Sequence, residues 1–155
     1  MLSADRPLRD ARWALERLEA TDNAVEFRVL WAATAALLRS VGHVLDKVDG
    51  GRSPALRSAV DQWWQGVKRD RAQHAIFWLF IEEERNHVLK EYELGYVEGE
   101  VTLAADGETF TLDSPIYKPL SNPDFNFEDA RDVASDALAW WEVQLRSVET
   151  AASGV

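Results

Sequence analysis

Four consecutive residues, Glu84-Arg85-Asn86-His87, bring together a carboxylate, a guanidinium, an amide and an imidazole. They fall in the segment 72–92, where apolar residues recur every three or four positions and predict a helix. On a helical wheel, Glu84 lies in the middle of the apolar face and Arg85 lies on the same face. A charged side chain on an apolar face costs free energy unless it is paired or hydrogen-bonded. These residues therefore need either a structural partner or a function.

One interpretation is a pair of buried structural ion pairs. The preceding long helix, predicted over residues 24–48, carries Arg39 and Asp46 within a narrow arc. Arg39 would then pair with Glu84, and Asp46 would pair with Arg85. Because ion-pair networks perturb charged groups much as active sites do, this interpretation stays open beside a functional one.

A second interpretation is a metal site. Glu84 and His87 have the Glu-x-x-His spacing of carboxylate-bridged di-iron bundles, which also need a second such pair on another helix. Neither His43 nor His74 is preceded by a glutamate at that spacing. The remaining possibility is a mononuclear metal site formed by the three histidines His43, His74 and His87. The chain also lacks a Gly-rich phosphate loop and other cofactor fingerprints. We therefore expect no metal and no cofactor.

Composition limits the classes of function. The 155 residues, of which 46% are hydrophobic, predict one folded domain spanning 1–155. The protein is acidic, with a formal net charge of −10, which disfavours a nucleic-acid-coating surface but leaves room for a small basic pocket. There is no cysteine, which excludes disulfides and thiolate chemistry. The longest apolar run, residues 75–81, is far shorter than the roughly 20 residues of a membrane span, so we expect a cytoplasmic protein without membrane association.

The elements that must position these residues are mostly helical. Apolar periodicity predicts a mainly α protein, a bundle of about five helices with one inserted β-hairpin. The predicted helices cover residues 7–20, 24–48, a segment beginning at Ser53-Pro54, 72–92 and about 127–149, the last capped by Asn126. The apolar stripe of the second helix is predicted to comprise Val25, Val29, Ala33, Leu37, Val41, Val44 and Val48, widened by Leu30, Leu38 and Leu45.

The inserted hairpin is predicted at about residues 96–112. Two alternating apolar and threonine-rich runs flank Asp106-Gly107, a dipeptide typical of two-residue hairpin turns. Such a turn pairs Leu103 with Phe110 and Val101 with Leu112 on one face, and Thr102 with Thr111 on the other. Because an isolated hairpin is marginally stable in water, the apolar face is expected to pack against the helices.

Several segments of the chain resemble the HEPN superfamily. They are residues 27–31, residues 38–45, a Trp-rich helix, and the run 80–86 that ends in Arg85-Asn86. HEPN domains are all-helical and often dimeric, and many are metal-independent ribonucleases of toxin–antitoxin and defence systems. Their signature is an arginine, a polar residue that is commonly asparagine, and a histidine a few positions further on. Arg85 and Asn86 match the first two elements, whereas Lys90 occupies the histidine's place.

The resemblance implies roles for individual residues. Arg85, Asn86 and His87 are the implied catalytic residues, with His87 standing in for the missing histidine, and Glu84, Lys90 and Arg39 are the implied binding residues. Cleavage of RNA without a metal needs a base for the 2′-hydroxyl and a cation for the phosphorane. A lysine is a poor base unless burial lowers its pKa strongly, so weak or absent ribonuclease activity is expected.

The resulting expectation is a HEPN-like domain of a defence, toxin–antitoxin or regulatory system, and whether it is an enzyme stays open. The alternative is a non-catalytic structural or protein-interaction helical dimer. Trp63-Trp64 and Trp140-Trp141 are adjacent pairs, and one helix face does not bury both members of a pair within a single bundle. Apolar residues left outside often mark an interface, so we expect a homodimer with room for a further protein partner.

Overall fold

The computed structural model describes residues 1–112 and 116–154, and it has the predicted mainly α architecture with an inserted hairpin. Its α-helices are α1 (Asp5–Ala20), α2 (Ala24–Val44), α3 (Pro54–Arg69), α4 (Glu83–Lys90) and α5 (Ala130–Ser153). Two π-helical turns, η1 (Leu45–Asp49) and η2 (Phe77–Glu82), follow α2 and precede α4, and η3 (Pro123–Phe125) is a 3-10 turn. The strands are β1 (Val101–Ala105) and β2 (Glu108–Leu112).

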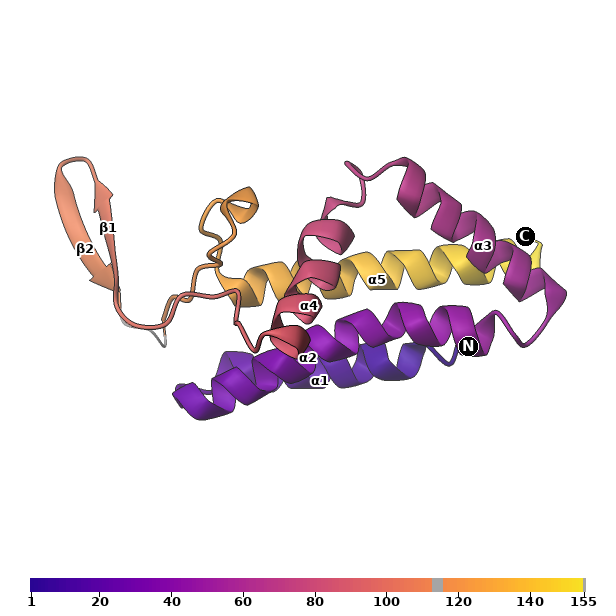
Figure 1. Ribbon diagram of the computed structural model, residues 1–155, viewed down its shortest axis with the longest axis horizontal. Coiled ribbons are helices and arrows are strands. Elements are labelled where there is room, and N and C mark those ends of the chain that lie inside the picture. Colours follow the sequence, from indigo (N-terminus) through magenta and orange to yellow (C-terminus); the bar gives the residue numbers. More distant parts are fainter. Residues whose placement is uncertain (113–115, 155) are drawn as a thin grey trace.

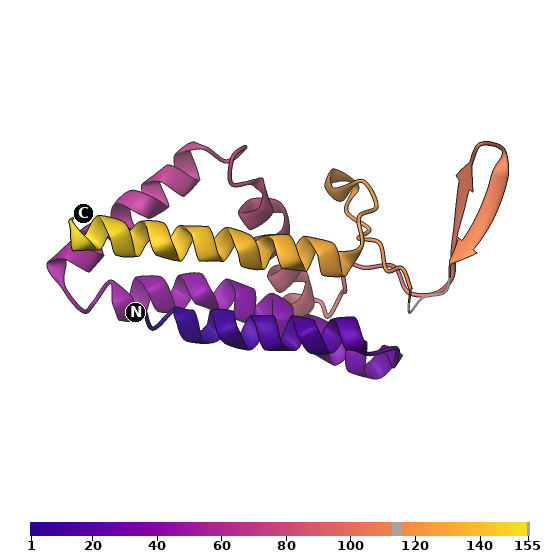
Figure 2. The same ribbon diagram turned by 180° about the vertical axis from the view of Figure 1, so that it is seen from behind.

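The long helices α1, α2 and α5 run side by side, while α3 and α4 cross them on one face (Figures 1 and 2). Both chain ends lie at the same end of the bundle, and the hairpin lies at the opposite end (Figure 1). In the part of the chain that the structure describes, no helix is both long and apolar enough to cross a membrane.

Local sequence signals account for where most helices begin. The Asn23 side chain accepts hydrogen bonds from the backbone N–H groups of Val25 and Glu26, as expected of an N-cap. Ser53 caps α3 in the same way, ahead of Pro54 in its first turn. The prediction for the last helix was three residues early. Asp129 caps α5, whereas Asn126 has a left-handed backbone conformation (φ 47°) that does not lead into a helix.

The apolar stripe predicted for the second helix is confirmed at Leu38, Val41 and Leu45 but wrong at its valine ends. Val25 and Val29 are each 57% exposed, and Val48 is also exposed. The N-terminal part of the buried face consists of Phe27, Trp31, Thr34 and Ala35, and the face continues through Leu38 and Val41 into Leu45. Both sets repeat every three or four residues, and the aromatic set reaches the core because Phe27 and Trp31 bury far more apolar surface than valines do.

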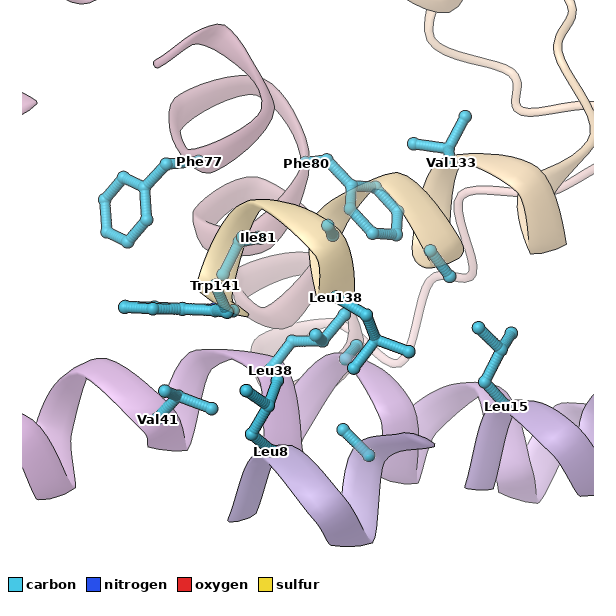
Figure 3. Packing of buried hydrophobic residues seen from close by; sticks show 14 of the residues in the cluster. Leu8, Leu15, Leu38, Val41, Phe77, Phe80, Ile81, Val133, Leu138 and Trp141 are labelled. Carbon is cyan, nitrogen blue, oxygen red and sulfur yellow. The ribbon is translucent and has the colours of Figure 1, made fainter. Parts of the chain in front are cut away.

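The core lies where α1, α2, α5 and the η2–α4 segment meet (Figure 3). Trp141 of α5 is fully buried between the η2 residue Phe77 and the α2 side chains. The inward face of α5 is formed by residues that are all buried: Val133, Ala137, Leu138, Trp141, Leu145 and Val148.

Of the adjacent tryptophans, Trp141 is fully buried, whereas Trp63, Trp64 and Trp140 are partly buried. Trp140 packs on Phe77, with 5.5 Å between ring centroids, and donates its indole N–H to His74 Nδ1. Trp63 donates to the side chain of Gln144 at 3.1 Å. All four tryptophans belong to one aromatic cluster on and around the core, because η2 and α3 cover the outer side of α5. The tryptophan pairs therefore do not support a homodimer, which stays a prediction.

The hairpin has the predicted register. Val101 pairs with Leu112, Thr102 with Thr111, and Leu103 with Phe110, in antiparallel strands. Asp106 and Gly107 form the turn with positive φ values of 52° and 81°, which the two-residue turn requires.

The packing predicted for the hairpin is wrong. Leu103 is 39% exposed and Phe110 51% exposed, and the strands extend away from the helices (Figure 1). The connecting segments are held at the end of the bundle by bridges between Tyr96 and Leu120 and between Pro119 and Asp129. Of these residues Tyr96, Pro119 and Leu120 are buried and close the core at that end, so the hairpin lies beyond it.

Candidate functional site

The segment that carries Glu84 and Arg85 is not one regular helix. After a turn at residues 71–74 the chain forms the π-helical η2 and then continues as α4. A π-helical turn inserts one extra residue per turn and so rotates the following side chains relative to a regular helix. Phe77, Phe80 and Ile81 stay in the core, and the residues after them are turned toward two different neighbourhoods.

Glu84 lies in the first of these neighbourhoods, next to the core. It is only 6% exposed, and its Oε1 accepts hydrogen bonds from the Trp31 indole N–H at 2.5 Å and from the Gly95 N–H at 2.8 Å. Burial raises the pKa of the Glu84 carboxyl, although the bonds from Gly95 and Trp31 partly oppose that shift. A Cβ on residue 95 would overlap Glu84 Oε2, so only glycine allows this approach.

The two predicted ion pairs are wrong. Glu84 is held by Trp31 and Gly95 rather than by Arg39. Asp46 instead pairs with Arg57 at 2.9 Å and with Lys47 at 2.9 Å. Asp46 lies in η1, where the π-helical turn alters the face that a regular helix would present, and α3 brings Arg57 to it.

Arg85 lies in the second neighbourhood, facing α2. It is half-buried, and its Nη1 donates to Asn86 Oδ1 at 2.8 Å. Within residues 1–112 and 116–154, no carboxylate forms a salt bridge with Arg85. Arg85 thus keeps most of its donors for another partner.

Arg85 is grouped with Arg39 and His43 of α2. Partial burial and then the positive charges of Arg39 and Arg85 lower the pKa of the His43 imidazole. Burial also lowers the pKa of Arg39, which Glu82 opposes and Arg85 reinforces. We call Arg39, His43 and Arg85 the cationic cluster. It favours a neutral imidazole on His43 beside two guanidinium groups.

A cavity of about 320 Å³ adjoins the cationic cluster between α2, η1, α3 and η2. Arg39 and His43 line it, and so do the aromatic side chains of Trp63, Trp64 and Phe77. The Arg39 guanidinium lies 5.6 Å from the centroid of the Phe77 ring. The lining also includes Asp46 and Asp61, which both form ion pairs with Arg57, so the cavity combines charges of both signs with flat apolar walls.

His87 and Lys90 do not join the cationic cluster. His87 is exposed and lines another cavity together with Glu84, and its charge acts on the Glu84 carboxyl. Lys90 is exposed at the last residue of α4. The catalytic roles that the resemblance implies for Arg85, Asn86 and His87 stay predictions, with the first two on one side of α4 and His87 on the other.

With this geometry described, the chain can be compared with known proteins. No family model, curated protein or solved structure matches it. Within the described residues, no group of three or more histidine, aspartate or glutamate side chains could hold a metal ion. The function must therefore be argued from the site itself.

Sequence reasoning missed three residues of these neighbourhoods. The sequence places His43 in one arc of the second helix with Arg39, four residues earlier, but it suggested a role for His43 only as a metal ligand. Trp31 and Gly95 carried no signal for a contact with Glu84. Trp31 lies 53 positions away in the chain, and a lone glycine after a helix normally indicates only a helix end.

Proposed function

We propose that this chain is a HEPN-like domain of a defence, toxin–antitoxin or regulatory system, one that binds single-stranded RNA at the cationic cluster and cleaves it weakly or not at all. The observation that carries the proposal is the position of His43. It is close enough to Arg39 and Arg85 for their charges to lower the pKa of its imidazole, and the proposal assigns to it, from α2, the role of the histidine that is missing after Arg85-Asn86.

The charge of the cluster supports phosphate binding. Arg85 has no carboxylate partner within the described residues, and a guanidinium matches phosphate oxygens with two parallel hydrogen bonds. The adjoining cavity adds the partly exposed rings of Trp63 and Trp64, on which an unstacked base would pack irrespective of sequence. A small basic site of this kind is compatible with the overall charge of −10, which disfavours a long duplex.

The same charges account for weak chemistry. Neutral His43 would accept the proton of a 2′-hydroxyl, that oxygen would attack the phosphorus, and Arg85 would stabilise the phosphorane. The 5′-oxygen would leave with a proton returned by His43, and the product would be a 2′,3′-cyclic phosphate. Because Arg39 and Arg85 disfavour the imidazolium that forms, His43 is a weak base in this position.

Fluorescence anisotropy with a labelled single-stranded RNA at low salt tests the proposal. Arg85→Ala and His43→Ala each remove part of the cluster, and Arg85→Ala is expected to weaken binding by about tenfold, as for one lost charge-assisted contact. Arg9→Ala is the matched control, because Arg9 is an exposed arginine of α1 and its loss changes the net charge equally. Gel analysis of the same RNA reports any cleavage and whether His43→Ala abolishes it.

Two results would contradict the proposal. One is an equal loss of RNA affinity in Arg85→Ala and Arg9→Ala, which would reduce the effect to net charge. The other is RNA binding that is absent from the wild type at low salt. Thermal melts of each variant separate a lost site from a lost fold.

A second candidate function is a protein-interaction homodimer, and the exposed hairpin favours it. Leu103 and Phe110 form an apolar pair on a strand surface that no helix covers. A second copy of the chain packing on this face would bury both side chains. Sedimentation equilibrium of the wild type and of a Leu103→Thr, Phe110→Thr double variant tests this. A dimer that the double variant loses supports it, and a wild-type monomer at micromolar concentration contradicts it.

A further inference from the structure

The outward face of α1 carries a tryptophan in a regular stripe of exposed residues. Trp13 is 61% exposed, whereas the opposite side of α1 is buried in the core. Residues three and four positions apart lie along one side of a helix, and through Trp13 they form a single exposed line, which we call the α1 stripe: Arg6, Arg9, Trp13, Glu16 and Ala20. Because a tryptophan carries a large apolar surface, this face is a candidate contact surface.

The apolar surface around Trp13 continues onto the neighbouring helix. A short loop joins α1 to α2, so the two helices run antiparallel, and Arg17 forms an ion pair with Glu26 at 3.1 Å. About one helical turn from that pair, counted backward in α1 and forward in α2, Trp13 lies level with Val29. Val29 is 57% exposed, and so is Val25 one turn earlier. The exposed tryptophan therefore has apolar neighbours at its own level of the bundle.

The charged residues of α1 differ in whether the chain supplies their partners. Arg12 forms an ion pair with Glu142 of α5. Arg9 and Glu16, which belong to the α1 stripe, form no ion pair within residues 1–112 and 116–154. Arg9 lies one turn before Trp13 and Glu16 one turn after it. The stripe is therefore positive toward the start of α1 and negative after its centre.

This order of charges is complementary to itself when a second copy of the chain is turned around. In a two-fold dimer with antiparallel α1 helices, Arg9 of each copy lies opposite Glu16 of the other. The midpoint between residues 9 and 16 falls about 0.75 Å from Trp13 along the helix axis. Both Trp13 side chains then lie at the two-fold axis between two identical ion pairs. A partner surface of uniform charge would instead oppose one half of the stripe with like charge.

We propose that the α1 stripe is a homodimer interface, in which α1 packs antiparallel on α1 of a second copy, Trp13 stacks on its equivalent and Arg9 pairs with Glu16. This contact is separate from the hairpin. The hairpin lies at one end of the bundle, beyond the core, so antiparallel α1 helices place the two hairpins at opposite ends of the dimer and leave both uncovered (Figure 1). Because the contact consists of one helix face and its border with α2, we expect a weak, reversible dimer.

Sedimentation velocity of the full chain between about 1 and about 100 µM tests the interface. Salt at about 0.1 M screens the overall repulsion of two copies of charge −10 more than it screens close ion pairs. We expect the wild-type sedimentation coefficient to rise with concentration. Trp13→Ala removes the central contact and is expected to weaken the dimer at least about tenfold. The Leu103→Thr, Phe110→Thr double variant is expected to dimerise as the wild type does.

Charge reversal tests the pairing itself. Arg9→Glu and Glu16→Arg each place like charges opposite one another across the two-fold axis, and each is expected to weaken the dimer about tenfold. The combined Arg9→Glu, Glu16→Arg variant keeps the net charge of −10 and restores opposite charges at both pairs, so it is expected to dimerise as the wild type does. Asp136→Arg is the matched control for Glu16→Arg, since Asp136 is exposed on α5 and the change in net charge is the same. Circular dichroism reports the fold of each variant.

Four results would overturn the proposal. One is a wild type that stays monomeric over the whole concentration range. Another is a loss in Glu16→Arg no larger than that in Asp136→Arg, which would reduce the effect to net charge. A combined reversal as weak as the single variants would exclude the pairing of Arg9 with Glu16. A dimer that Trp13→Ala keeps and the hairpin double variant loses would assign the contact to the hairpin. None of these outcomes depends on RNA binding at the cationic cluster.

Discussion

Glu84 and Arg85 are neighbours in α4, yet they lie in environments of opposite charge. Glu84 is buried against Trp31 and Gly95, beside a cavity lined by further carboxylates. Arg85 is half-buried and faces the basic side chains of α2. Successive residues of a helix point about 100° apart, so one helix can present two unrelated sites. Glu84 is therefore held mainly by hydrogen bonds that stabilise the fold, whereas most Arg85 donors are left available for a ligand.

The sharpest test of this comparison is Glu84→Ala, which is expected to have the largest effect on stability. The substitution removes the acceptor for two donors, Trp31 Nε1 and the Gly95 N–H, and leaves a void. We expect the free energy of unfolding to fall by about 2–4 kcal/mol. Urea denaturation measures it, with Glu84→Gln as the conservative control. If the free energy of unfolding fell less in Glu84→Ala than in Glu84→Gln, these hydrogen bonds would not hold the loop that contains Gly95.

Gly95→Ala is the next largest effect. Its Cβ would overlap Glu84 Oε2, which is buried and has little freedom to move aside. We expect a loss of about 1–3 kcal/mol in the free energy of unfolding, as for other overpacked sites. Gly66→Ala in α3 is the control, since no atom lies within 4 Å of the added Cβ there. An unchanged unfolding midpoint for Gly95→Ala would show that the Glu84 side chain is mobile.

The pH dependence of stability is expected to separate Glu84 from the other acids. Burial raises its folded-state pKa above the ordinary value of 4.5. Its contribution to the free energy of unfolding is therefore fully present below pH 4.5 and is lost as pH rises through the folded-state pKa.

Unfolding of the wild type and Glu84→Gln across this pH range measures the contribution as a difference. The difference is expected to fall with rising pH. The contribution of Asp49 to stability has the opposite pH dependence, because its folded-state pKa is lowered. Burial raises that pKa, but the hydrogen bonds from the N–H groups of Ser3 and Ala4 and from the Arg52 side chain lower it by more. A wild-type minus Glu84→Gln difference that stays flat with pH would contradict the raised pKa.

Arg85→Ala is expected to have the smallest effect on stability. Its only hydrogen bond described is to Asn86, and its loss relieves repulsion with Arg39. We expect a change within about 1 kcal/mol in the free energy of unfolding. Thermal melts beside those of Glu84→Ala measure the contrast directly. Destabilisation by Arg85→Ala as large as that by Glu84→Ala would remove the distinction between the two sides of α4.

Much of the local structure followed from residues close together in the chain. Asn23 and Ser53 cap the helices that they precede, and Asp106-Gly107 turns the hairpin in the predicted register. The candidate Arg85-Asn86 pair was also visible in the sequence, since the two residues are consecutive. These features depend on interactions within a few residues, which sequence patterns report directly.

The tertiary structure alone decided which residues surround Glu84 and Arg85. Trp31 and Gly95 reach Glu84 from different segments, and His43 reaches the neighbourhood of Arg85 because α2 packs beside α4. It also decided that the hairpin extends from the bundle, since the buried Tyr96 and Leu120 close the core before the strands begin. A sequence shows which side chains are apolar or charged. Which of them meet depends on how whole helices pack, and here two π-helical turns changed the faces that regular periodicity would have presented.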